Sequence, residues 1–111
     1  MAVLRPRADD YESATPRPED VLLLVEVADS TPRDDRDIKI PLYAESGIAE
    51  CWLVDIVGRA VEVYRQPMGG RYAESWRVGP DGTLGIAALP GMNLAASDLF
   101  RPASVSGLLS R

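Results

Sequence analysis

The sequence contains no histidine and a single cysteine, Cys51. The absence of histidine excludes Ser-His and Cys-His catalytic arrangements and the usual imidazole ligands of zinc. A single cysteine excludes a disulfide within the chain, and Cys51 itself has no sequence neighbour that would make its thiol reactive, so a buried structural thiol is expected. Any site chemistry must therefore come from carboxylates, lysine, arginine, tyrosine and the backbone.

Long apolar runs are also missing. No stretch approaches the roughly 20 residues that a membrane-spanning helix needs, and the opening residues MAVLRPRADD become charged too early for a signal peptide. A net charge of -5 argues against indiscriminate binding to nucleic-acid phosphates but leaves room for a local basic groove. We expect a cytoplasmic protein with one domain over residues 1–111, whose last residues, 101–111, form a frayed tail.

An acid interrupts the most apolar segment of the chain. The run from Val21 to Ala28 is short, rich in valine and leucine, and ends in turn-forming residues, which predicts a buried strand. Side chains alternate along a strand, so Glu26 shares one face with Leu22, Leu24 and Ala28, while Leu23, Val25 and Val27 share the other. A carboxylate in such a place needs a partner, because burying an unpaired charge is costly.

Helix signals follow over residues 30–47, with acids in the first turn and Gly47 as the stop. Pro41 is discordant, because an interior proline removes a backbone hydrogen bond and crowds the preceding turn, which predicts a kink or a break between Asp37 and Pro41. Lys39 and Tyr43 are four residues apart and therefore share one helix face. Beyond Gly47 the pattern predicts an antiparallel meander of strands, then short strands and a helical turn before residue 101. Within this region Trp52 and Tyr64 are expected in the core, Trp76 half-buried, and Asp55 in a turn.

Lys39 is the only lysine in a chain that otherwise uses eleven arginines for its positive charge. Lysine is a compact point charge whose pKa can shift, whereas arginine is always protonated, so a lone lysine is a candidate for chemistry. A solvated lysine on a helix surface is the alternative interpretation. Arg33 and Arg36 have two interpretations as well: contacts to a substrate phosphate, or pairing with the neighbouring acids Asp34, Asp35 and Asp37.

The segment LLLVEVADSTPRDDRDIKIPLYAESGIAECWLVDIVGRAVEVYRQP resembles the Uma2 family, also called DUF820, within the PD-(D/E)XK nuclease-like superfamily. The resemblance runs from about Ala2 to about Phe100. Its most specific part is an ordered series of residues and motifs, namely Glu26 in VEVADS, Asp35-Arg36, Lys39, Tyr43, Gly47, ECWLVD and VEVYR. It implies an α/β fold with a restriction-endonuclease-like core, in which a mixed sheet carries a helix after the Glu26 strand and continues as an antiparallel meander.

The resemblance also implies a Mg²⁺-dependent endonuclease that hydrolyses phosphodiester bonds of nucleic acid, with Mn²⁺ as an alternative ion. Glu26 would be a metal-binding acid, the Val27 carbonyl a further metal donor, and Lys39 the lysine that orients or activates the attacking water. Arg36 would face substrate, and Tyr43 would form the wall of the site or donate a hydrogen bond.

The sequence departs from the family pattern at its front. Family members carry a Pro-Asp pair at the head of the strand preceding the Glu26 strand, and here that position would precede Met1, so an N-terminal truncation that lacks the first metal acid is expected, with weak Mg²⁺ affinity. Asp9 and Asp10 are the candidate substitutes. The expected consequence is a homodimer or higher oligomer, because an unpaired strand edge favours self-association. Two functions remain: a nuclease that completes its site from a second subunit, and a catalytically inactive module that binds partners.

Overall fold

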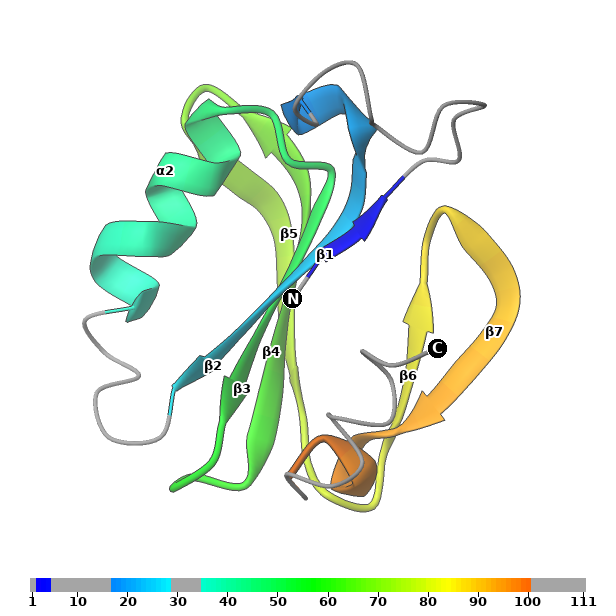
Figure 1. Cartoon of the computed structure of the whole chain (residues 1–111). Coiled ribbons are helices and arrows are strands. Elements are labelled where there is room, and N and C mark those ends of the chain that lie inside the picture. Colours follow the sequence, from blue (N-terminus) through cyan, green and yellow to red (C-terminus); the bar gives the residue numbers. More distant parts are fainter. Residues whose placement is uncertain (1, 5–16, 29–34, 101–111) are drawn as a thin grey trace.

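The computed structural model describes residues 2–4, 17–28 and 35–100, which form two sheets and four short helical segments (Figure 1). The larger sheet has the strand order β1-β2-β3-β4-β5, and β6 pairs with β7 in a separate hairpin. The strands are β1 (Ala2–Leu4), β2 (Val21–Ala28), β3 (Glu50–Asp55), β4 (Ala60–Met68), β5 (Arg71–Val78), β6 (Thr83–Ile86) and β7 (Leu89–Ala95). The helical segments are η1 (Pro18–Asp20), η2 (Asp35–Lys39), α2 (Ile40–Glu45) and η3 (Ala96–Phe100).

The sheet is mixed, as the sequence predicted. Strands β2 and β3 are parallel, whereas β1 with β2, β3 with β4, and β4 with β5 are antiparallel. A parallel pair requires a crossover connection, and η2 and α2 lie in that connection. The predicted fold class is therefore confirmed: a restriction-endonuclease-like α/β core, with its helix after the Glu26 strand and an antiparallel meander from β3 to β5.

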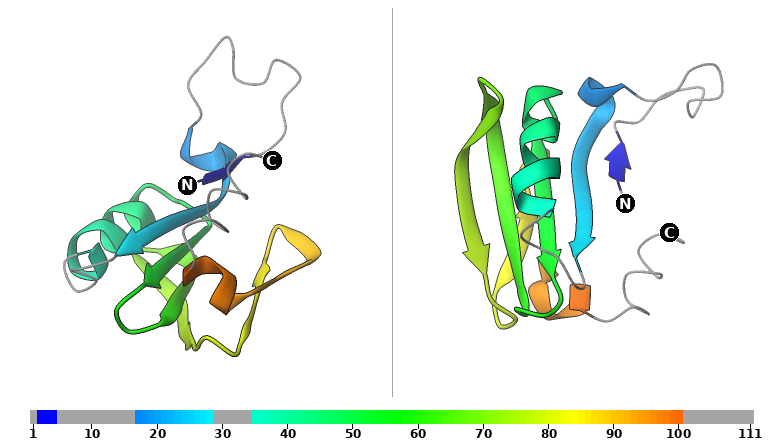
Figure 2. Two further views of the ribbon diagram at one scale, coloured as in Figure 1. Left: turned by 60° about the horizontal axis from the view of Figure 1, so that its bottom comes forward. Right: turned by 90° about the vertical axis from the view of Figure 1, so that its left-hand side faces the viewer.

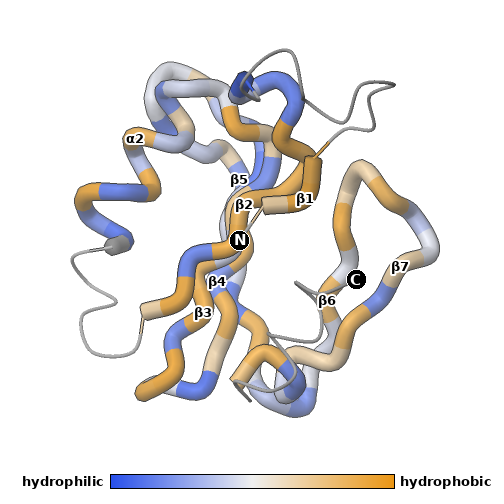
Figure 3. Tube along the Cα trace, viewed as in Figure 1, coloured by the Kyte–Doolittle hydropathy of each residue, from blue (hydrophilic) through white to orange (hydrophobic). Residues whose placement is uncertain are grey.

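Two apolar clusters hold three layers together. Helix α2 covers one face of the sheet, and the β6–β7 hairpin with η3 covers the other (Figures 1 and 2). Leu23 and Val25 of β2 belong to the cluster on the hairpin side, whereas Leu24 and Ala28 pack in the cluster on the helix side. The predicted alternation of β2 is confirmed. Figure 3 shows that β1 and β2 are largely apolar, in contrast to the more hydrophilic outer strand β5.

The helical connection changes from π-helical to α-helical winding just before Pro41. Residues Asp35–Lys39 form a π-helix that continues directly as α2, so Pro41 occupies the first turn of α2, where its missing N–H is tolerated. Gly47 ends the helix with φ of +82°. Its N–H donates to the Ala44 carbonyl at 3.1 Å, and the Ile48 N–H donates to the Tyr43 carbonyl at 3.0 Å, the pattern of a Schellman cap. The predicted stop is confirmed, whereas the helix does not break at the proline but changes from π-helical to α-helical winding.

The structure also shows the positions of three aromatic residues and one acid that the sequence analysis singles out. Trp52 is buried, Tyr64 packs partly buried beside the helix-side cluster, and Trp76 is 42% exposed on β5. Asp55 accepts a hydrogen bond from the Gly58 N–H at 2.8 Å, as a turn-forming acid does. Among the described helices none is long and apolar enough to cross a membrane. The expected frayed tail at 101–111 lies outside the described residues.

Candidate active site

Glu26 faces the helix, and two helix side chains meet its carboxylate. Lys39 Nζ lies 3.5 Å from Glu26 Oε2, and the Tyr43 hydroxyl donates a hydrogen bond to Glu26 Oε1 at 2.5 Å. The Glu26 side chain is 23% exposed and that of Lys39 is 48% exposed, so the pair lies at a partly open surface. The acid in the apolar run thus has a cation and a hydroxyl as partners, and solvent reaches the three groups.

The direction of the Val27 carbonyl follows from the hydrogen bonding of β2. It pairs with Val54 in the parallel ladder, and the next carbonyl, that of Ala28, accepts the Ile56 N–H across β3. Successive carbonyls of a strand point to opposite sides, so the Val27 carbonyl points away from β3. The described residues of β1 pair with Val21–Leu24, and no described strand pairs with this edge at Glu26–Ala28.

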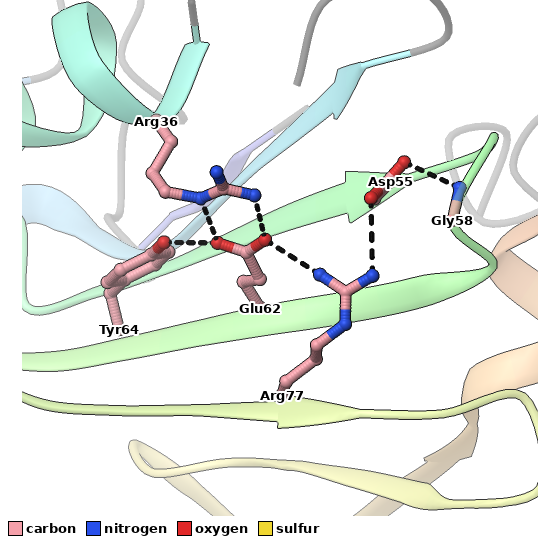
Figure 4. A network of polar contacts seen from close by, with 6 residues as sticks. All are labelled: Arg36, Asp55, Gly58, Glu62, Tyr64 and Arg77. Carbon is pink, nitrogen blue, oxygen red and sulfur yellow. Dashed lines mark hydrogen bonds and ion pairs between the residues drawn. The ribbon is translucent and has the colours of Figure 1, made fainter. Parts of the chain in front are cut away.

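A second acid, Glu62, anchors two arginines on the same face of the sheet (Figure 4). Arg36 from η2 binds it in a bidentate pair, with Nε donating to Oε1 at 2.7 Å and Nη2 donating to Oε2. Arg77 Nη1 from β5 donates to Oε2 at 3.0 Å, and the Tyr64 hydroxyl donates to Oε1 at 2.5 Å. Arg77 also reaches Asp55, with 3.4 Å between Nη2 and Oδ2. Within the described part of the chain, Arg36 therefore pairs with Glu62 and not with its neighbour Asp37.

The environment of Glu62 favours its ionised form. Burial opposes ionisation, but hydrogen bonds from Arg36 and Tyr64 and the charges of Arg36 and Arg77 outweigh it and lower the pKa of Glu62 below its ordinary value. The hydrogen bond to Glu62 in turn raises the pKa of Arg36. Burial, followed by the hydrogen bond to Glu62, raises the pKa of Tyr64. Ionised Glu62 is therefore a fixed acceptor around which the arginines are arranged.

The two acids belong to one row across the sheet. Glu26 pairs with Leu53, Leu53 pairs with Glu62, and Glu62 pairs with Arg77. Paired residues lie on the same face, so this row aligns the two polar groups side by side beneath η2 and α2, with Leu53 between them. The sequence interpretation missed Glu62, although an acid between Val61 and Val63 carries the same signal that singled out Glu26.

Glu50, another buried acid, has a different position and role. Glu50 accepts hydrogen bonds from Trp52 Nε1 at 2.8 Å, from Arg65 Nε at 2.9 Å and from the Ala87 N–H at 2.9 Å. These contacts tie β3 and β4 to the segment that joins β6 and β7. Each carboxylate oxygen is occupied by protein donors, so Glu50 serves as a structural clamp rather than a site residue.

The donors at Glu26 fit part of a divalent-metal shell. Mg²⁺ prefers hard oxygen ligands, commonly one or two carboxylates together with waters and substrate oxygens. Glu26 and the Val27 carbonyl are donors of this kind, but residues 2–4, 17–28 and 35–100 contain no group of three acid, cysteine or histidine side chains arranged to hold a metal. Asp9 and Asp10, the candidate substitutes, lie outside the described residues.

Comparison with known proteins places this arrangement in a family. A search of curated proteins found no match. A family model described as "Uma2: Putative restriction endonuclease" matches residues 1–97, which is most of the chain. The match spans the strand with Glu26, the helical connection with Arg36, Lys39 and Tyr43, and the meander with Glu62. The chain therefore belongs to the Uma2 family, a family of restriction-endonuclease-like, nuclease-related proteins.

Proposed function

We propose that this protein is a Mg²⁺-dependent endonuclease that hydrolyses phosphodiester bonds of nucleic acid. The observation that supports the proposal most directly is the contact of Lys39 and Tyr43 with Glu26 in a chain of the Uma2 family. Glu26 offers a carboxylate to a metal ion at a partly open surface, and Lys39 places an ammonium beside it. In the reaction a bond forms between the water oxygen and phosphorus, and the bond from phosphorus to the leaving oxygen breaks. The water proton passes to solvent, and the leaving oxygen takes up a proton from solvent.

The roles follow from the chemistry of each group. The Glu26 carboxylate and the Val27 carbonyl would hold the ion, which when bound supplies charge neutralisation at the phosphate and lowers the pKa of water. The Lys39 ammonium orients the attacking water and offsets negative charge as it develops on the phosphate oxygens. Tyr43 fixes the Glu26 carboxylate through its hydroxyl and forms a wall of the site.

A complete metal shell requires a further acid. We propose that a second copy of the chain supplies it, by pairing along the edge of β2 that faces away from β3, beside Glu26–Ala28, where no described strand pairs. This assembly would make the protein a homodimer or higher oligomer. It would also explain how Glu26, whose carboxylate already has two protein partners, gains enough negative charge around it to attract a dication.

One observation favours the alternative function, a catalytically inactive module that binds partners. Lys39 and Tyr43 both contact the Glu26 carboxylate, and the described residues contain no group of three acid, cysteine or histidine side chains that could hold a metal. In that case the contacts of Lys39 and Tyr43 with Glu26 are a structural remnant that fixes the helix on the sheet. The exposed edge of β2 is then the functional surface.

Titration calorimetry and cleavage assays decide between the two functions. Mg²⁺ and Mn²⁺ are titrated into the wild type, Glu26→Gln and Lys39→Ala, and the same preparations are incubated with single- and double-stranded DNA and RNA. A nuclease binds metal and cleaves, loses both with Glu26→Gln, and with Lys39→Ala loses cleavage but keeps metal binding. Absence of metal binding and cleavage in all three proteins, with equal circular dichroism spectra, contradicts the nuclease and supports the inactive module.

A further inference from the structure

The two arginines on Glu62 offer hydrogen-bond donors to a ligand. The Arg36 side chain is 38% exposed and the Arg77 side chain 49% exposed, although both are fixed by a buried acid. Arginine carries five N–H donors, and the contacts with Glu62 and Asp55 use only some of those on each guanidinium. Because Glu62 fixes both guanidinium groups, they have already lost much of the side-chain freedom that a ligand would otherwise have to restrict.

A pocket opens beside Arg77 and the acid that holds both arginines. Glu62, Tyr64, Ser75, Trp76 and Arg77 line a pocket of about 210 Å³. A neighbouring pocket of about 250 Å³ shares Tyr64 and Ser75 and extends to Arg71 and the first residues of α2. The two hollows therefore form one groove along β5, with an arginine toward each end. Residues 71 and 77 are roughly 20 Å apart along a strand, a span of several nucleotides.

The chemistry of this groove suits phosphate. Guanidinium groups bind phosphate oxygens in planar, bidentate geometry, and the hydroxyl of Ser75 can donate to the same oxygens. Glu62, which lines the groove, and Asp55, which contacts Arg77, are already paired with arginine, which reduces their repulsion of an anion. The groove also lies in register with the candidate site, because Arg77, Glu62 and Glu26 belong to one row across the sheet.

We propose that Arg36 and Arg77, fixed by Glu62, bind a backbone phosphate of nucleic acid next to the bond that is cleaved, and that the strand continues along β5 toward Arg71. The proposal deepens the nuclease function and rests on it. Glu62 acts here as a positioning residue, because it holds both arginines in place and its own oxygens face them rather than the substrate.

Binding without metal tests this subsite separately from cleavage. Fluorescence anisotropy measures the affinity for a short fluorescein-labelled single-stranded DNA and for RNA of the same sequence, in EDTA, over a NaCl series. Arg77→Gln is compared with Arg17→Gln, which removes the same charge from an exposed arginine outside the groove. Ser75→Asp places an anion in the groove without removing an ion pair, and Thr83→Asp on β6 is its control.

The expected result is that Arg77→Gln and Ser75→Asp each weaken binding about tenfold, whereas both controls bind as the wild type does. The dependence of log K on log salt should become shallower by about 0.7 for single strands in Arg77→Gln, since one phosphate contact is lost. Inorganic phosphate competing at low millimolar concentration, without any dependence on a nucleic-acid chain, would identify a free-phosphate site and overturn the proposal.

Failure of the subsite is distinguishable from failure of the nuclease. Tight binding that Arg77→Gln and Ser75→Asp leave unchanged, in a protein that cleaves with dependence on Glu26, overturns the subsite and leaves the nuclease standing. A wild-type protein that neither binds nor cleaves DNA or RNA overturns both. Thermal unfolding of each variant identifies loss of the fold, and Ser75→Asp carries the test if Arg77→Gln unfolds.

Discussion

Lys39 and Glu26 are thirteen residues apart in the sequence, yet the lysine ammonium lies 3.5 Å from the glutamate carboxylate. The contact joins the helical connection to the strand that precedes it. Because both side chains reach solvent, we expect it to serve the site rather than the stability of the fold.

The energy of the Lys39–Glu26 pair should be small. Ion pairs that reach solvent typically contribute about 0.2–1 kcal/mol, so a double-mutant cycle of Glu26→Gln and Lys39→Met in urea should give a coupling within that range. The single variants should remain folded at room temperature, which makes their metal binding and activity interpretable. A coupling above roughly 3 kcal/mol would mean that the pair behaves as a buried one and that its role is structural.

Glu62 should make the stability depend on pH in acid. The pKa of Glu62 is lower in the folded than in the unfolded chain, so the unfolded chain binds the proton more readily. The stabilisation is therefore fully present above the ordinary glutamate pKa of 4.5 and is lost as the pH falls through the lower, folded value.

Urea unfolding between neutral pH and about pH 3 measures this contribution. Glu62→Gln should lower the free energy of unfolding by about 2 kcal/mol at neutral pH, because it weakens charge-assisted hydrogen bonds, and it should flatten the acid dependence. Glu74→Gln, at an exposed acid on β5, is the matched control. If the free energy of unfolding falls equally steeply with decreasing pH in the wild type and in Glu62→Gln, then groups other than Glu62 dominate the acid dependence.

Cys51 should be inert in the folded protein. It is fully buried, and burial, reinforced by the charges of Glu26 and Glu50, raises its pKa to about 12. A disulfide reagent at pH 8 should therefore label the native protein only at the rate of unfolding, and label it at once in urea. Rapid labelling without denaturant would contradict the burial of β3 that the structure describes.

The β2 edge should mediate self-association. Light scattering at micromolar concentration is expected to give at least twice the monomer mass, and Val27→Lys should reduce it to the monomer, because a lysine at a strand edge opposes pairing. Val57→Lys is the control, since Val57 is also an exposed valine and lies outside β2. A monomeric wild type would remove the proposal that a second copy completes the metal shell.

Local sequence signals predict the elements and single out the residues that meet at Glu26. Glu26 is conspicuous as an acid in an apolar strand and Lys39 as the only lysine, and Tyr43 shares the helix face of Lys39. Both reach Glu26 even though Lys39 ends a π-helical turn. The end of the helix at Gly47 is also predicted locally, since glycine is the residue that most often follows the last turn of a helix.

The contacts around Glu62 depend on the register of the strands, which local sequence patterns do not specify. Arg36 and Glu62 are 26 residues apart, and their contact requires the parallel pairing of β2 with β3 and the exact alignment of β4 on β3. Arg77 comes to Glu62 only through the pairing of β4 with β5. Local charge patterning instead favoured Asp34, Asp35 and Asp37 as partners of Arg36, because proximity in sequence was the only proximity visible.

The parallel pairing of β2 with β3 also has a consequence for the order of folding. Strands β3, β4 and β5 pair through short turns. Strand β2 pairs with β3 across the longer helical connection, and closing this longer loop costs more chain entropy. Glu62 and Arg77 can therefore form their contact when β4 and β5 pair, whereas Glu26, Arg36 and Lys39 join them only with β2 and its helical connection.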